Sequence, residues 1–256
     1  MAFWIAIVLG LVQGLTEFLP VSSSGHLVLL EKSFGVELDY TFLNVILHFA
    51  TLLAVCWFYR KRLWQIVRHP FSKQSQYLII ATIPAILFVL MCNNFVESKL
   101  SSMLFVGIGF LVTAILLVVA EIINKKSVNH TNVGYGNSLL IGVSQALAIF
   151  PGLSRSGTTL AFGLMCGVKK DEALDFSFLM SVPIILGSLV YEMVDKKVFS
   201  APLPTADILP IILGFVIAFF TAILSIKLMQ NVVKKMKLLW FVPYLAILGV
   251  ITIVLG

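Results

Sequence analysis

Long runs of apolar residues constrain this chain more than any other feature of its sequence. A helix needs roughly 20 apolar residues to cross about 30 Å of hydrocarbon. Six runs have about that length: 40–59, 77–96, 103–123, 173–194, 208–228 and 238–256. Hydrophobic residues make up 59% of the sequence and charged residues 12%, a balance typical of integral membrane proteins. We therefore predict an all-α integral membrane protein, a single membrane domain over residues 1–256 with six transmembrane helices.

The basic residues predict how the chain is oriented. Cytoplasmic loops carry an excess of Lys and Arg. If residues 60–76 face the cytoplasm, alternation places thirteen of the 18 Lys and Arg residues on that side. The opposite side then holds four: Lys32, Lys99, Lys196 and Lys197. We therefore attribute the net charge of +6 to membrane-facing loops and expect no nucleic-acid partner, with both chain ends outside.

Two segments, 1–30 and 137–168, are apolar only in their first half and then break at Pro, Gly and Ser. The alternation above works only if each segment returns to the side from which it entered. Non-helical backbone at membrane depth survives where it is buried in protein or lines a wet cavity. We predict two re-entrant helical hairpins. The first apolar stretch lacks the basic residues that precede a cleaved leader, so we expect it to be retained.

The two broken segments resemble each other. An offset of 132 residues aligns QGLTEFLPVSSSGH (13–26) with QALAIFPGLSRSGT (145–158), and it also superposes three spans of each half. The halves, 1–123 and 137–256, would each contain one re-entrant segment and three spans. Because three is odd, the second half would be inverted, an arrangement that forms binding sites near the membrane midplane. Glu17, His26 and Arg155 would then share one cavity.

The second motif, PGLSRSGTT, predicts a phosphate-binding site. An ionisable group at the membrane centre costs about 3 kcal/mol, so it indicates function by default. Arg155 is flanked by the hydroxyls of Ser154, Ser156 and Thr159 at the expected start of a helix. A guanidinium, hydroxyls and helix N-terminal amides together suit an oxyanion. The alternative is a structural ion pair between Arg155 and Glu17.

In the first motif, Gln13 and Glu17 lie four residues apart and would share one face of a helix. A carboxylate beside a phosphate is repelled unless it binds a divalent cation or acts as a base, which favours a metal site at Glu17 and Gln13. The alternative is that Glu17 only pairs with Arg155.

The run from Ser22 to His26 adds hydroxyls and an imidazole. Three attacking groups stay open: Ser23 with His26 as its base, which we favour, His26 itself, or a metal-bound water. Simple hydrogen bonding within a loop is the alternative to any of them. His48, inside a spanning run, is either a packing residue or a group that supports the site.

Together, QGLTEFLPVSSSGH and PGLSRSGTT resemble the two signature motifs of the undecaprenyl pyrophosphate phosphatase family, also called bacitracin-resistance proteins, and the similarity covers the whole chain. The resemblance implies a metal-dependent phosphatase of the bacterial plasma membrane. It would remove one phosphate from a polyprenyl diphosphate carrier used in cell-wall synthesis, with its active site open to the extracytoplasmic side.

By the same resemblance, Glu17 matches the essential glutamate, Ser23 and His26 match residues proposed for catalysis, and Arg155 lies in the phosphate-binding motif. The binding residues would be Gln13, Ser22, Ser154, Ser156 and Thr159. A Mg²⁺ or Ca²⁺ ion is implied, although Gln13 replaces the glutamate found in some members. A homodimer stays open. A polyprenyl phosphate transporter or flippase without hydrolysis is the alternative function, since inverted repeats are common among transporters.

Overall fold

The computed structural model describes residues 3–34, 41–100, 102–126, 130–195, 205–235 and 237–256, without the side chains of 92–100, 195, 205–207 and 255. This part of the chain contains no strand beyond one isolated bridge, so the predicted all-α class is confirmed. The α-helices are α1 (Phe3–Phe18), α2 (Ser23–Ser33), α3 (Thr41–Phe58), α4 (Arg60–Arg68), α5 (Lys73–Leu100), α6 (Met103–Lys126), α7 (Tyr135–Leu147), α8 (Arg155–Met165), α9 (Lys170–Asp195), α10 (Thr205–Lys234) and α11 (Phe241–Leu255).

Five helices are long and apolar enough to cross a membrane. Helices satisfy their backbone polar groups internally, which hydrocarbon requires. The five stretches correspond to the first five predicted runs: Thr41–Phe58, Lys73–Met91, Met103–Lys126, Lys170–Val194 and Ile208–Lys234.

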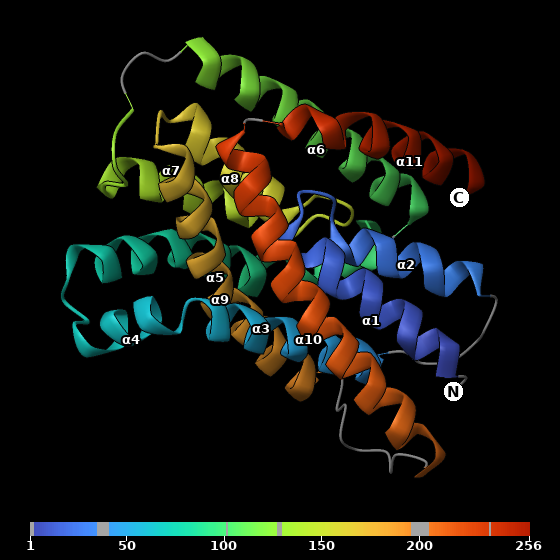
Figure 1. Ribbon diagram of the computed structural model, residues 1–256. Helices are drawn as coiled ribbons and strands as arrows, with labels where there is room; N and C mark the ends of the chain where they lie inside the picture. The colour runs from blue at the N-terminus through green and yellow to red at the C-terminus, as the bar shows by residue number, and fades with distance from the viewer. Residues whose placement is uncertain (1–2, 35–40, 101, 127–129, 196–204, 236) are drawn as a thin grey trace.

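The sixth predicted run, 238–256, forms a shorter element. Its first residues, Leu238–Trp240, adopt a 3₁₀ turn, and α11 begins only at Phe241. At 1.5 Å per residue, α11 rises about 22 Å, which is less than the hydrocarbon thickness. It lies along α6 (Figure 1). A Cβ on Gly107 of α6 would be 2.8 Å from the carbonyl oxygen of Gly249, so the two backbones approach closely.

Short links, residues 19–22 and 148–154, separate α1 from α2 and α7 from α8. The last residue of each link, Ser22 or Ser154, caps the next helix. Its hydroxyl accepts a hydrogen bond from the backbone amide three residues later, at 3.4 and 3.1 Å respectively. Such caps replace partners that a helix N-terminus lacks. Gly152 has a φ of +79°, and a Cβ there would lie 2.0 Å from a backbone oxygen of α6, so this link requires glycine.

Each broken helix pair packs against a long helix from the other part of the chain. Helix α1 lies along α10, and α7 lies along α5 (Figure 1). A Cβ on Gly10 would be 2.5 Å from the carbonyl oxygen of Gly214, and one on Gly142 would be 2.4 Å from that of Ala81. Small residues allow this close contact between helices in a membrane.

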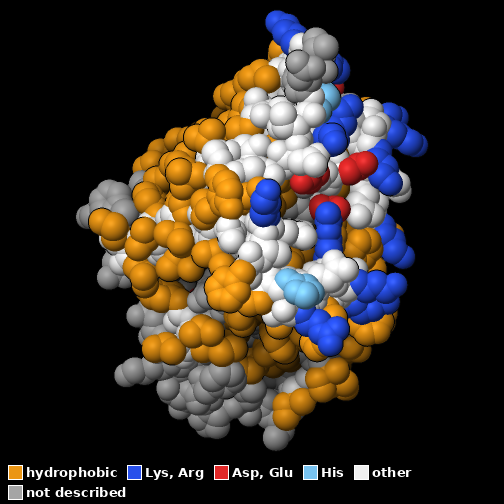
Figure 2. All heavy atoms as spheres, turned by 90° about the vertical axis from the view of Figure 1, so that its left-hand side faces the viewer, with side chains coloured by type: hydrophobic (Ala, Val, Ile, Leu, Met, Phe, Trp, Pro, Cys, Tyr) orange, Lys and Arg blue, Asp and Glu red, His pale blue; other side chains and the backbone are white. Residues whose placement is uncertain are grey.

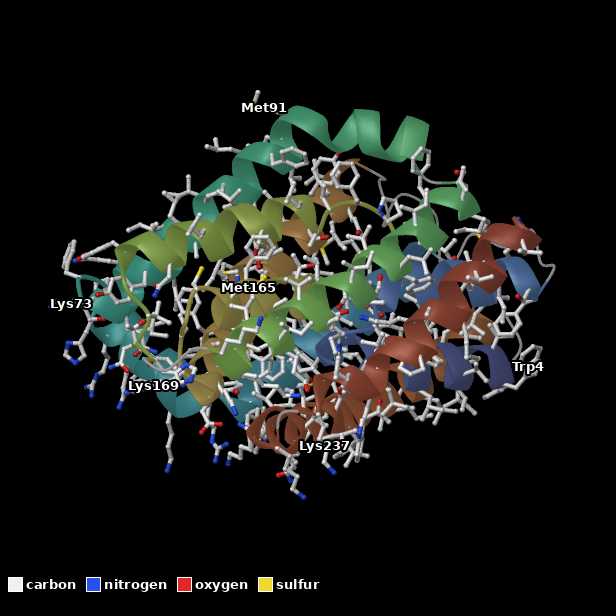
Figure 3. The ribbon with its side chains drawn as sticks, turned by 90° about the horizontal axis from the view of Figure 1, so that it is seen from above. Trp4, Lys73, Met91, Met165, Lys169 and Lys237 are labelled. Atoms are coloured by element: carbon white, nitrogen blue, oxygen red, sulfur yellow. The ribbon has the colours of Figure 1, made fainter. Side chains whose placement is uncertain are left out.

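Charged and apolar side chains separate on the surface. On the face in Figure 2, Lys and Arg gather toward one edge, while hydrophobic side chains cover the opposite side. In Figure 3, Lys73 and Lys169 lie at one end of the molecule and Trp4 lies at the other. Lys237, also labelled in Figure 3, lies between these two ends, along the lower edge of that view.

A polar contact joins the start of α9 to the link between α3 and α4. The Tyr59 hydroxyl donates a hydrogen bond of 2.7 Å to Asp175, which also pairs with Arg62. Burial, and then the Asp175 carboxylate, raise the pKa of Tyr59. The phenol therefore stays protonated and acts as a donor.

Candidate active site

The link 19–22 contacts the first turn of α8, which brings the two sequence motifs together. The Ser156 hydroxyl donates a hydrogen bond of 2.9 Å to the carbonyl oxygen of Leu19. A Cβ on Gly157 would lie 3.1 Å from the side chain of Pro20. The C-terminal end of α1 is therefore held beside the N-terminal end of α8.

Glu17 accepts hydrogen bonds at both of its carboxylate oxygens. Oε1 pairs with the Arg155 guanidinium. Oε2 accepts from the Ser23 hydroxyl at 2.5 Å and from the Gln13 amide at 3.0 Å. Glu17 is 5% exposed, so this carboxylate depends on its partners for stabilisation. The ion pair between Glu17 and Arg155, which was the alternative reading of both residues, is present, and Ser23 is bonded to the same carboxylate.

The hydroxyls around Arg155 divide into two groups. Ser154 caps α8. It also lines the cavity described below, and so do Ser22 and Ser23. Ser156 and Thr159 bond inside the protein, and Thr159 lies 2.6 Å from the hydroxyl of Ser177. In this conformation Ser156 and Thr159 hold α8 in place and do not line the cavity.

His26 points away from Glu17. Its Nδ1 donates to the Ser22 carbonyl oxygen at 2.7 Å, because a carbonyl can only accept. In the neutral imidazole, Nε2 then accepts from the Tyr244 hydroxyl at 2.5 Å, and the ring is stacked on that phenol. The pairing of Ser23 with His26 that we favoured from the sequence is not formed. The proton acceptor beside Ser23 is Glu17.

His48 lies beside Glu17 and lines the cavity, so it is more than a packing residue. Its Nδ1 donates to the Asn44 carbonyl oxygen at 2.8 Å, so Nε2 faces Glu17, 4.0 Å from Oε2. The side chain is 27% exposed and lines the cavity. The structure therefore favours the supporting role that the sequence left open.

A cavity of about 390 Å³ joins these groups to the apolar surfaces of α5 and α9. Its walls are largely aliphatic, with Ala85, Ile86, Val89 and Leu90 from α5 and Pro183, Ile184 and Ile185 from α9. The polar lining consists of Thr16, Glu17, Ser22, Ser23, Ser24, His48, Gln145, Ser154, Arg155, Ser188, Tyr191 and Glu192. A charged head and an apolar chain could both be accommodated.

The available donors suit a hard divalent cation. Among the described residues, no group of three or more His, Cys, Asp and Glu side chains is placed to hold a metal. Glu17 nevertheless lies beside Gln13, whose Oε1 is buried and has no hydrogen-bond partner in the described part of the chain. Carboxylate and amide oxygens are ligands that Mg²⁺ and Ca²⁺ prefer. Gln13 is fully buried and does not line the cavity as Glu17 does, so an ion held by this pair would need further ligands from outside the protein.

Gln145 is a cavity residue to which the sequence reasoning assigned no role. It lies on α7, is 4% exposed and lines the cavity. The signal was present in the sequence, because Gln145 aligns with Gln13 in the 132-residue offset.

The fold and the cavity define a helical membrane protein in which an arginine, a carboxylate and a serine meet at the end of an apolar pocket. The family model described as bacitracin resistance protein BacA matches residues 6–251. This chain belongs to that family.

Curated relatives match nearly the full length. The chain is 38% identical to an undecaprenyl-diphosphatase of Carboxydothermus hydrogenoformans, over 98% of this chain and 96% of that one. It is also 38% identical to an undecaprenyl-diphosphatase of Methanobrevibacter smithii, covering 96% and 95% of the two chains. A Thermosipho melanesiensis protein of the same name is 36% identical over 98% of each chain.

Proposed function

We propose that this protein is an undecaprenyl-diphosphatase: a membrane hydrolase that converts a polyprenyl diphosphate to the monophosphate and inorganic phosphate. Such a reaction would recycle the lipid carrier for cell-wall synthesis. The observation that best supports this activity is that the Ser23 hydroxyl is hydrogen-bonded to the Glu17 carboxylate, which also pairs with Arg155. The names of the full-length relatives support this activity and its substrate class.

In the proposed reaction, the diphosphate enters the polar end of the cavity and its polyprenyl chain lies along the aliphatic walls. Arg155 donates to phosphate oxygens and keeps one donor on Glu17, since a guanidinium has five N–H groups. The amides at the start of α8 also favour an anion there.

The Ser23 oxygen then attacks the terminal phosphorus while Glu17 accepts the hydroxyl proton, and the bond to the polyprenyl monophosphate breaks. Water afterwards cleaves the phosphoserine and releases phosphate. The bond of 2.5 Å from Ser23 to Glu17 supports the carboxylate as the base, because proton transfer needs this contact. His26, bonded to Tyr244, supports the first turn of α2, which carries Ser23.

We also propose that Glu17 and Gln13 hold a divalent cation, Mg²⁺ or Ca²⁺. When bound, the ion would supply positive charge that offsets the negative charge of the diphosphate. Titration of the purified protein with Mg²⁺ and with Ca²⁺ would identify the ion that it binds.

Arg155→Lys should lower kcat/KM for phosphate release by more than tenfold, which corresponds to about 1.4 kcal/mol in the transition state. An ammonium is a point charge and cannot bond Glu17 and phosphate with the planar fork of a guanidinium. The matched control is Arg62→Lys, because Arg62 pairs with Asp175 away from the cavity and should keep near wild-type activity. Equal rates for the two variants would contradict the proposed role of Arg155.

We propose the inverted-repeat topology for the fold, with six crossings and two re-entrant hairpins in the plasma membrane. Two features support it: the helix caps at Ser22 and Ser154 are 132 residues apart, and α1 and α7 pack reciprocally on α10 and α5. The cavity extends to Leu90 and Glu192, which lie in the halves of α5 and α9 farther along each helix from Lys73 and Lys170. This supports a site that opens to the extracytoplasmic side.

The topology predicts that a cysteine at position 65 reacts with a membrane-impermeant thiol reagent only after cells are permeabilised. Gln65 is an exposed residue of the basic helix α4, and basic loops remain in the cytoplasm. The variant is made in a background lacking Cys56, Cys92 and Cys166. Ser33→Cys, on the proposed outer side, is the control that should react in intact cells. Labelling of position 65 in intact cells would overturn the orientation.

The test of the proposed function is phosphate release from a polyprenyl diphosphate by the purified protein in detergent, with and without added Mg²⁺ or Ca²⁺. A hydrolase releases one phosphate for each substrate molecule. A protein that binds the lipid and releases none would fit the transporter alternative, and the proposed reaction would be wrong.

A further inference from the structure

The amide of Gln145 is buried without a protein partner. Gln145 is 4% exposed, and neither its Nε2 nor its Oε1 has a hydrogen bond within the described residues. Leaving a buried polar group unpaired is costly, and most such groups in folded proteins are bonded. Because Gln145 lines the cavity, a molecule entering the cavity could supply the missing partner.

The relation between the two motifs explains why this amide is free. Gln13, the counterpart of Gln145, donates to Glu17 one helical turn later. One turn after Gln145 the chain has Ile149, which offers no acceptor. The second motif therefore repeats the glutamine without the carboxylate that accepts a hydrogen bond from its Nε2 in the first.

The neighbours of Gln145 indicate the chemistry of its ligand. Arg155 and Ser154 line the same cavity, and both suit an oxyanion. The carboxylates of the cavity are Glu17, already bonded to Arg155, and Glu192 at the end of α9. We propose that Gln145 is a substrate-binding residue whose Nε2 donates a hydrogen bond to an oxygen of the diphosphate. This inference rests on the proposed function and adds a ligand from α7 to those from α1, α2 and α8.

The proposal makes binding and stability change in opposite directions. Methionine has nearly the shape of glutamine and no amide. Gln145→Met should therefore weaken binding of a farnesyl methylenediphosphonate, which cannot be hydrolysed at its P–C–P bridge, by about tenfold, or about 1.4 kcal/mol. The same variant should melt at the wild-type temperature or above it, because it removes an unsatisfied buried amide.

Two further variants make the comparison specific. Gln145→Asn keeps an amide but withdraws it by one methylene group, so its affinity should lie between those of wild type and Gln145→Met. Ser144→Ala is the matched control, since Ser144 is buried on α7, bonds the Ile141 carbonyl oxygen and does not line the cavity. It should bind the phosphonate as wild type does.

Calorimetric titration and thermal melting of the purified proteins decide the matter. Unchanged affinity in Gln145→Met, or a loss of affinity that accompanies a lower melting temperature, would show that Gln145 is not a substrate ligand. If wild type hydrolyses polyprenyl diphosphate normally in that case, only this inference fails. If wild type neither binds the phosphonate nor releases phosphate, the proposed function fails with it.

Discussion

Glu17→Gln should lower kcat/KM for phosphate release at least a hundredfold, about 2.7 kcal/mol, while the protein stays folded. The amide cannot take the proton from Ser23, and it cannot neutralise Arg155, the two tasks that the carboxylate is placed to perform. General bases contribute about 10²- to 10⁴-fold. Phosphate release is measured at saturating divalent cation, with a thermal melt to verify folding.

Glu121→Gln is the matched control for that experiment. Glu121 is also a buried glutamate, but it pairs with Lys125 and accepts from the amide of Leu239, away from the cavity. Its substitution should leave kcat/KM near that of wild type. A Glu17→Gln enzyme as active as the Glu121→Gln enzyme would show that Glu17 is structural.

Ser23→Ala should reduce phosphate release by about a thousandfold or more, since it removes the attacking oxygen and leaves only binding and charge stabilisation. In wild type, rapid quench with a diphosphate labelled at its terminal phosphate should trap label on Ser23. Ser33→Ala is the control, because Ser33 is exposed on α2 and bonds only the carbonyl oxygen of Leu29.

His26→Ala should lower phosphate release less than Ser23→Ala, because His26 positions the first turn of α2 and Glu17 is the proposed base. Substantial turnover by Ser23→Ala, with no phosphoprotein in wild type, would instead favour a metal-bound water. If Ser23→Ala, His26→Ala and the double variant lose the same fraction of phosphate release, the two residues act as one unit and His26 takes part directly in the reaction.

Hydropathy predicted the long helices well because hydrocarbon leaves the backbone few alternatives. At 238–256 it did not predict the 3₁₀ turn, so α11 begins later and is shorter than the apolar run. The proximity of Glu17 and Arg155 was also predictable, because opposite charges inside a membrane segment are stabilised by pairing and the two residues lie in aligned, broken segments.

The direction of individual side chains was not predictable in the same way. Ser23 and His26 are close in sequence, but the orientation of His26 depends on Tyr244 at the far end of the chain. His48 could not be assigned because its distance from Glu17 depends on how α3 packs beside α1. Contacts between segments far apart in the sequence determine the orientations of His26 and His48, and these contacts cannot be read from local residue spacing.

The reciprocal packing of α1 on α10 and of α7 on α5 has a consequence for the order of synthesis. A chain leaves the ribosome N-terminus first, so Glu17 enters the membrane before Arg155 and α10 exist to receive it. Until then its carboxylate lacks the guanidinium, at a cost of about 3 kcal/mol if it lies at the membrane centre. The native contacts of the first segment can therefore form only after α10 has been synthesised, and a truncated first half would lack both its helix partner and its counter-charge.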